Sequence, residues 1–196
     1  MIKIALIRHS KTKGNLEGRY IGTTDEHLCD EGIELLKTKS YPKVEYIYSS
    51  PLLRCIETAQ IIYDGSSYLV HDGLRECSFG DFENKNYEEL KDNEYYQRWI
   101  DSNGTLPFPN GEDGMVFRSR CVKAFDDIVE DMITKGNKSC AIIVHGGTIM
   151  SILDKYSFPN KDFYNWQVKN GEGFLAEIDE EKWKQGIKSL YNIKII

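Results

Sequence analysis

The sequence predicts an α/β fold in a single domain, with helices layered on a largely parallel sheet. Strand-like apolar runs alternate with segments of helical spacing, which is typical of parallel strands joined by helical crossovers. The 196 residues suffice for one substantial core but not for two comfortable domains, so we expect residues 1–196 to fold as one unit. The composition, 40% hydrophobic and 29% charged, is ordinary for a globular protein.

Six strands are expected from runs of apolar, β-branched and aromatic residues. In chain order they cover residues 2–7, 44–48, 68–70, 140–144, 174–178 and 189–196. Helical spacing follows Gly32, follows Pro51, extends over residues 115–133 and resumes at Thr148. Pro51 suits a first helical turn, and Gly136 and Asn137 end the longest helix. Residues 104–114 are rich in turn-forming residues and are expected to form a loop.

Charge and cysteine content exclude several classes of protein. The 31 acidic residues outnumber the 25 basic ones, and a net charge of -6 argues against a nucleic-acid-binding protein. No run approaches the roughly 18 apolar residues of a membrane span. The chain enters a strand pattern at Ile2 without a charged-then-apolar leader, so we expect a cytoplasmic protein with no membrane partner. The five scattered cysteines form no C-x-x-C pair, so we expect reduced thiols rather than disulfides or a zinc site.

Cationic side chains follow three of the predicted strands at the point where each strand ends. The first strand runs into Arg8 and His9, the second leads to Arg54 in the next helix, and the fourth ends at His145. Ligands of such sheets bind beyond the carboxyl ends of the strands, so these side chains should converge. Guanidinium groups match phosphate oxygens bidentately, and backbone N–H groups at a helix start also bind anions. A strand-end arginine is usually solvated and a lone histidine usually structural, so the predicted phosphate site depends on this recurrence.

Four motifs in sequence order carry a family resemblance. They are "RHS" with Asn15, "SSPLLRCIETA", "LRECSFGDFE" and "VHGG", and they span residues 2 to about 148. Together they resemble the histidine phosphatase superfamily, also called the phosphoglycerate-mutase-like family. The resemblance implies a three-layer α/β/α sandwich with a mostly parallel central sheet. It also implies a small-molecule phosphomonoester substrate and neither a cofactor nor a metal.

The resemblance also assigns roles to individual residues. His9 resembles the nucleophile, whose imidazole must be neutral to attack phosphorus, with its other nitrogen donating to a backbone carbonyl. Glu76 resembles the general acid and must begin protonated, so its pKa should be raised by partial burial. The residues that resemble the family's phosphate pocket are Arg8, Asn15, Arg54, a protonated His145, which also counts as catalytic, and Gly146. Glu83 is expected to support its loop.

Two departures from the family pattern lie directly after His9. Ser10 replaces a glycine next to the nucleophile, where it either crowds the backbone or adds a contact to phosphate. Lys11 replaces a glutamate or glutamine and makes the site more cationic.

The substrate is predicted from residues 18–32, "GRYIGTTDEHLCDEG". This stretch resembles the alpha-ribazole phosphatase branch of the family, which implies a phosphatase acting on alpha-ribazole 5'-phosphate in cobalamin assembly. Arg19, Tyr20 and Thr23 are the specificity residues of this prediction. The alternatives are a phosphoglycerate mutase, a broad-specificity phosphatase and a non-catalytic phosphate-binding regulator. A homodimer is left open as the oligomeric state.

Overall fold

One sheet of six strands runs through the molecule in the order β3-β2-β4-β1-β5-β6, in a computed structural model that describes residues 1–196. The strands are β1 (Ile2–Arg8), β2 (Tyr46–Ser49), β3 (Leu69–Val70), β4 (Ser139–Val144), β5 (Gly173–Ile178) and β6 (Leu190–Ile195). The first four pair in parallel, whereas β5 and β6 are antiparallel to their neighbours. The mostly parallel sheet of the sequence prediction is confirmed.

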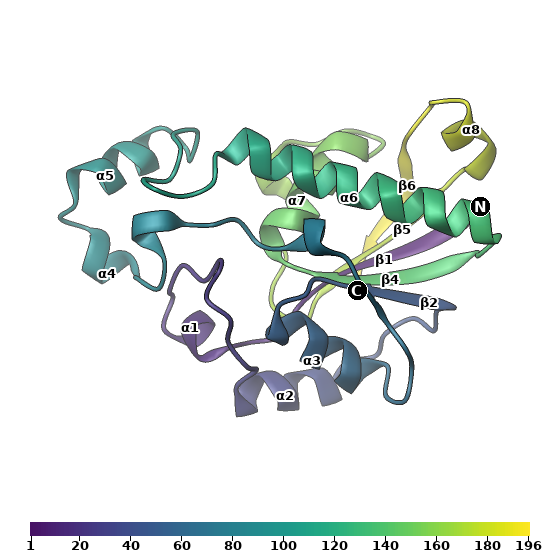
Figure 1. The fold of residues 1–196 in the computed structure, drawn as a ribbon, viewed down its shortest axis with the longest axis horizontal. Coiled ribbons are helices and arrows are strands. Elements are labelled where there is room, and N and C mark those ends of the chain that lie inside the picture. Colours follow the sequence, from purple (N-terminus) through teal and green to yellow (C-terminus); the bar gives the residue numbers. More distant parts are fainter.

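Helices cover both faces of this sheet (Figure 1). On one face α6 (Gly114–Lys135) and α7 (Gly146–Tyr156) pack on Ile4, Leu6 and Ile142. On the other face α3 (Leu53–Ile62) packs on Ile7 and Ile143, and α2 (Asp30–Lys37) lies beside α3. Successive residues of β1 and β4 therefore enter opposite cores, as the strand period of two requires. The three-layer α/β/α sandwich is confirmed.

Element boundaries differ from the sequence prediction by one or two residues for most elements. Pro51 was expected in a first helical turn, but α3 begins at Leu53 and Pro51 lies in the bend before it. The remaining helices were not predicted because they are short or polar. They are α1 (Lys13–Leu16), α4 (Tyr87–Leu90), α5 (Glu94–Asp101) and α8 (Glu180–Lys184), with the 3-10 turns η1 (Asp72–Leu74), η2 (Gly80–Phe82) and η3 (Phe163–Trp166).

The parallel strands end together at one edge of the sheet. In the register of β1 and β4, Arg8 lies opposite Val144, and in that of β2 and β4, Ser49 lies opposite Ile143. The segments that follow these three strands therefore meet in space. None of the helices combines the length and the apolar character that crossing a membrane would require.

Candidate active site

His9 follows β1 directly and is 4% exposed. Its Nδ1 lies 2.6 Å from the backbone oxygen of Ser10. Because a carbonyl oxygen can only accept, Nδ1 carries the proton and Nε2 keeps its lone pair. Burial, followed by the charges of Arg54 and Arg8, lowers the pKa of His9 well below its ordinary value. The imidazole is therefore neutral and has the tautomer that a nucleophilic Nε2 requires.

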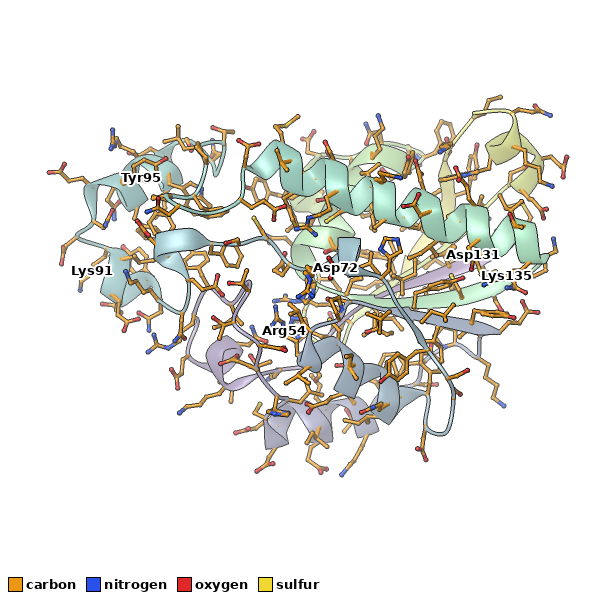
Figure 2. All side chains as sticks on the ribbon, in the orientation of Figure 1. Arg54, Asp72, Lys91, Tyr95, Asp131 and Lys135 are labelled. Carbon is orange, nitrogen blue, oxygen red and sulfur yellow. The ribbon has the colours of Figure 1, made fainter.

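Two arginines bring unpaired N–H groups to the neighbourhood of His9. Arg54, on the first turn of α3, is fully buried in the interior of the molecule (Figure 2) and donates to the backbone oxygens of Gly22 and Thr24, each at 2.8 Å. Arg8 donates from Nη1 to the Val168 oxygen at 2.7 Å. The Nε atoms of both arginines are buried without an acceptor. A buried donor left unpaired costs about 1–3 kcal/mol, so an oxyanion that accepts from both would be stabilised here.

His145 lies against His9, with the ring centroids 5.2 Å apart and edge to face. Its Nε2 is 2.8 Å from the Ser50 hydroxyl oxygen. Burial, then Arg54 and His9, lowers the pKa of His145 well below its ordinary value. Without phosphate the ring, buried beside two guanidinium groups, is therefore neutral, and the expected protonated imidazole stays a prediction for the phosphate-bound site. Gly146 begins α7, and a Cβ added there would lie 3.5 Å from Arg8 Nε.

Glu76 lies on a segment between η1 and η2 and is half-buried. Its Oε1 accepts a hydrogen bond from the Cys77 N–H at 3.0 Å. Burial raises the pKa of the Glu76 carboxyl, against the opposing effect of that hydrogen bond and of the two arginines. A Cβ on Gly147 would lie 2.8 Å from Oε1, so the approach of Glu76 to the start of α7 requires glycine there.

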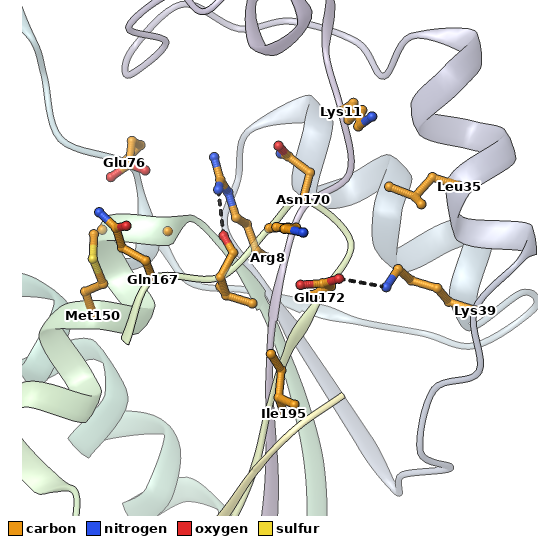
Figure 3. A pocket seen from close by; sticks show the side chains of 14 residues that line it. Arg8, Lys11, Leu35, Lys39, Glu76, Met150, Gln167, Asn170, Glu172 and Ile195 are labelled. Atoms are coloured by element: carbon orange, nitrogen blue, oxygen red, sulfur yellow. Dashed lines mark hydrogen bonds and ion pairs between the residues drawn. The ribbon is translucent and has the colours of Figure 1, made fainter. Parts of the chain in front are cut away.

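A cavity of about 940 Å³ opens at this edge of the sheet (Figure 3). Arg8 and Glu76 line it together with Gly146 and Gly147. Three lysines also line it, namely Lys11, Lys39 and Lys169. The ammonium group of Lys39 lies 3.3 Å from the Glu172 carboxylate. In Figure 3, Glu76 and Met150 lie on one side of Arg8, and Lys11 and Lys39 on the other. The geometry can therefore bind a phosphoryl group between a neutral imidazole, two guanidinium groups and a carboxylic acid.

Comparison with known proteins decides the family. The sequence profile of the "Histidine phosphatase superfamily (branch 1)" matches residues 4–188. The chain belongs to this superfamily.

Relatives within the superfamily differ in the activities that their names give. "Putative phosphoserine phosphatase 2" of Hydrogenobacter thermophilus is 31% identical over 165 residues, 78% of this chain and 77% of that protein. The adenosylcobalamin/alpha-ribazole phosphatase of Salmonella typhimurium is 25% identical over 182 residues and 87% of each chain. The crystal structure of the alpha-ribazole phosphatase from Shigella flexneri has the same fold, with a TM-score of 0.75, 24% identity and 91% of each chain covered.

The expected specificity residues of this histidine phosphatase lie outside the cavity wall. Arg19 pairs with Glu17 and Glu89, at 2.6 and 2.7 Å. The Tyr20 hydroxyl lies 2.9 Å from that of Tyr96, within an aromatic cluster. Thr23 is exposed and makes no side-chain hydrogen bond. None of the three lines the cavity, and neither do the buried His9, Arg54 and His145, so their role in specificity stays a prediction.

Asn15 and Ser10 are held by hydrogen bonds within the protein. Asn15 Oδ1 accepts from the Thr12 N–H at 3.2 Å, which leaves the amide nitrogen of Asn15 to donate to a ligand. The Ser10 hydroxyl donates to the Gly32 oxygen at 2.6 Å. The Ser10 hydroxyl therefore anchors α2 to the segment that carries His9, and its proton is not free to bond to a phosphate oxygen.

Two residues support the site from outside the cluster of reacting groups: Asn170 was not predicted, and Glu83 was expected only to support its loop. Asn170 donates to the backbone oxygen of His9 and to Asn15 Oδ1, each at 3.1 Å, and no sequence signal marks it within the irregular segment before β5. Glu83 supports a loop, as expected, by accepting hydrogen bonds from Gly22 and Thr24. These are the residues whose carbonyl oxygens hold Arg54, so Glu83 acts on the phosphate site through that loop.

Proposed function

We propose that this histidine phosphatase is a cytoplasmic phosphomonoesterase that acts through a phosphohistidine on His9. One observation carries the proposal. The Nδ1 proton of His9 is committed to the Ser10 oxygen, while the unpaired Nε groups of Arg8 and Arg54 lie close enough to depress the pKa of His9. A tetrahedral oxyanion accepts from both arginines and presents its phosphorus to the free Nε2.

The reaction divides into two displacements at phosphorus. In the first, His9 Nε2 bonds to phosphorus, the ester P–O bond breaks and the Glu76 carboxyl gives its proton to the leaving oxygen. In the second, the Glu76 carboxylate takes a proton from water as that water attacks phosphorus, and the Nε2–P bond breaks to release phosphate. Arg8, Arg54 and the Gly146 N–H stabilise the equatorial oxygens throughout.

His145 and Asn15 complete the proposed phosphate site. His145 takes up a proton only when the phosphate dianion is bound, because the added negative charge opposes the effect of burial and of Arg54 on its pKa. Asn15 contributes its free amide nitrogen.

Alpha-ribazole 5'-phosphate is the substrate we propose. Support comes from the resemblance of residues 18–32 to that branch and from the alpha-ribazole phosphatase of Salmonella typhimurium among the relatives. Arg19, Tyr20 and Thr23 lie in this segment and do not line the cavity, so the proposal gives them an effect on specificity through the shape of the segment.

A second candidate is phosphoglycerate mutase activity. A mutase that depends on 2,3-bisphosphoglycerate, from Nautilia profundicola, is 26% identical over 232 residues, 98% of this chain and all of that protein. Lys11 and Lys169 could hold the carboxylate of a phosphoglycerate in the larger cavity. Interconversion of 3- and 2-phosphoglycerate with the bisphosphate primer tests this candidate directly.

The test is hydrolysis of a panel of phosphomonoesters, including alpha-ribazole 5'-phosphate, with and without EDTA. We expect turnover that survives the chelator and falls by several orders of magnitude in His9→Ala. His27→Ala is the matched control, because the His27 side chain is 72% exposed and pairs only with Glu57. Wild-type rates in His9→Ala would refute the assignment of His9 as the nucleophile. Phosphate binding without turnover of any ester would instead indicate a non-catalytic regulator.

A further inference from the structure

A second cavity, of about 200 Å³, adjoins the larger one beside the proposed general acid. The two cavities share Glu76, Gly147 and Met150 in their walls. Unlike the cationic cavity, the smaller one is lined mainly by aromatic side chains, namely Phe79, Trp99, Phe108, Phe117, Phe163 and Tyr164. We refer to it as the aromatic pocket. Apart from Glu76, no residue of its wall has a role in the proposed reaction.

The walls of the aromatic pocket come from segments far apart in the sequence. Phe108, from the loop before α6, lies 5.0 Å from Phe79 and 5.2 Å from Trp99, measured between ring centroids. On α6, the Arg118 guanidinium lies over the ring of Phe163, 3.7 Å from its centroid. These contacts hold the rings in place around the space, so the pocket exists before any ligand enters.

The charged side chain in the wall limits what the pocket can hold. Arg118, the one cation of the wall, is stacked on Phe163 and lies 3.8 Å from Asp154. A carboxylate placed here would lose its hydration against aromatic walls, and Arg118 would compensate for little of that loss because it already has Asp154 as an anionic partner. An uncharged aromatic ring would instead bury its apolar surface against these walls without losing a charge's hydration.

We propose that the aromatic pocket binds a compact aromatic ring of the leaving alcohol. The inference rests on the proposed phosphatase reaction, since the group protonated by Glu76 is the oxygen of that alcohol. A cavity of about 150 Å³ lined by apolar side chains holds benzene, so about 200 Å³ accommodates one ring or a small fused ring system. The enzyme therefore prefers phosphomonoesters that carry a ring near the ester oxygen over those of small hydroxy acids.

The first test compares 2-phenylethyl phosphate with ethyl phosphate and phosphoserine. The first two esters share a primary alkoxide leaving group and differ in the ring. We expect kcat/KM for the phenylethyl ester to exceed that for each of the other two by about ten- to a hundredfold. Equal values for the phenylethyl and ethyl esters, or a preference for phosphoserine, would overturn the proposal.

Substitution in the pocket wall tests the same preference. Trp99→Ala and Phe163→Ala should each reduce the phenylethyl-to-ethyl ratio by about five- to tenfold, mainly through KM, because each removes one aromatic wall. Ile187→Ala is the control, since Ile187 is 54% exposed and lines neither cavity. A ratio that stays at the wild-type value in both pocket variants would contradict the assignment.

A binding measurement separates this inference from the proposed reaction. Titration with 2-phenylethanol should change the fluorescence of Trp99, and Trp99→Phe should abolish that change while Trp166 and Trp183 remain. If no ester is hydrolysed but the alcohol binds at Trp99, the phosphatase proposal fails and the pocket assignment stands. If esters are hydrolysed without ring preference and the alcohol leaves Trp99 unchanged, the pocket assignment fails and the phosphatase proposal stands.

Discussion

Replacing Glu83 by alanine should weaken both folding and phosphate binding, although this residue touches no substrate in the proposed reaction. Its Oε1 accepts from the Gly22 N–H at 2.8 Å and from the N–H and hydroxyl of Thr24, each at 2.9 Å, and its Oε2 accepts from the Phe79 N–H at 3.2 Å. The carbonyl oxygens of Gly22 and Thr24 in turn accept from Arg54. Loss of Glu83 therefore frees the loop that orients the buried guanidinium.

The size of the effect follows from these contacts. A hydrogen bond to a charged group contributes about 1.5–3 kcal/mol net, but Glu83 is half-buried and water can replace part of what is lost. We expect Glu83→Ala to lower the free energy of unfolding by about 2–4 kcal/mol, less than the sum of four such bonds. A displacement of Arg54 of the order of 1 Å would lower kcat/KM by about a hundredfold.

Urea unfolding measures the first quantity, and steady-state kinetics with inorganic phosphate as a competing ligand measures the second. Glu83→Gln keeps an oxygen acceptor for the Gly22 and Thr24 groups and should recover most of the loss of both. Glu88→Ala is the control for removing a nearby carboxylate, because the Glu88 side chain is 72% exposed and pairs only with Lys91.

The reasoning would be refuted by a Glu83→Ala variant that unfolds at the wild-type urea concentration and binds phosphate with wild-type affinity. A variant that loses stability but keeps its phosphate affinity at low urea would show that the loop does not orient Arg54.

Three further predictions concern the reacting groups and their neighbours. Activity should fall as pH rises through the raised pKa of Glu76, because the acid form donates the first proton. The lowered pKa of His9 keeps the imidazole neutral at pH values where a free histidine would already be protonated, so a pH–rate profile without an acid-side optimum would contradict both assignments. Glu76→Gln should slow the hydrolysis of alkyl phosphates far more than that of p-nitrophenyl phosphate, whose leaving group needs no proton, and equal losses on both esters would exclude Glu76 as the acid. The same substitution should stabilise the fold at pH values above the raised pKa, because the partly buried carboxylate of the wild type is charged there and opposes folding. Ser10→Gly should lower the free energy of unfolding by about 1–2 kcal/mol through loss of the bond to Gly32 and added chain flexibility, and urea denaturation checks this.

Strand order predicts which cationic side chains meet at the site, whereas Glu76 and Asn15 were expected only from the family resemblance. Arg8 ends β1, and His9 and His145 directly follow β1 and β4, which are adjacent and parallel, so their position at one sheet edge is a consequence of strand order. The side chain of Arg54 was placed correctly because α3 begins just after β2 ends.

Charge state and loop contacts depend on packing between distant segments and could not be predicted in the same way. The sequence predicts that His145 lies at the end of a strand, but not its charge. The pKa of His145 is lowered by complete burial and by the neighbouring Arg54 and His9, which only the folded structure shows. Likewise, the Ser10 hydroxyl could bond to phosphate or to the protein until the position of Gly32 was known.

The sequence by itself determined the layered α/β fold and the convergence of cationic side chains at one sheet edge, because both follow from local periodicity and from the geometry of parallel strands. Only the tertiary structure decided the protonation states, the role of Glu83 and the aromatic pocket. Each of these depends on burial and on contacts between segments such as α5, α6 and η3, whose distance in space is not encoded in any local pattern.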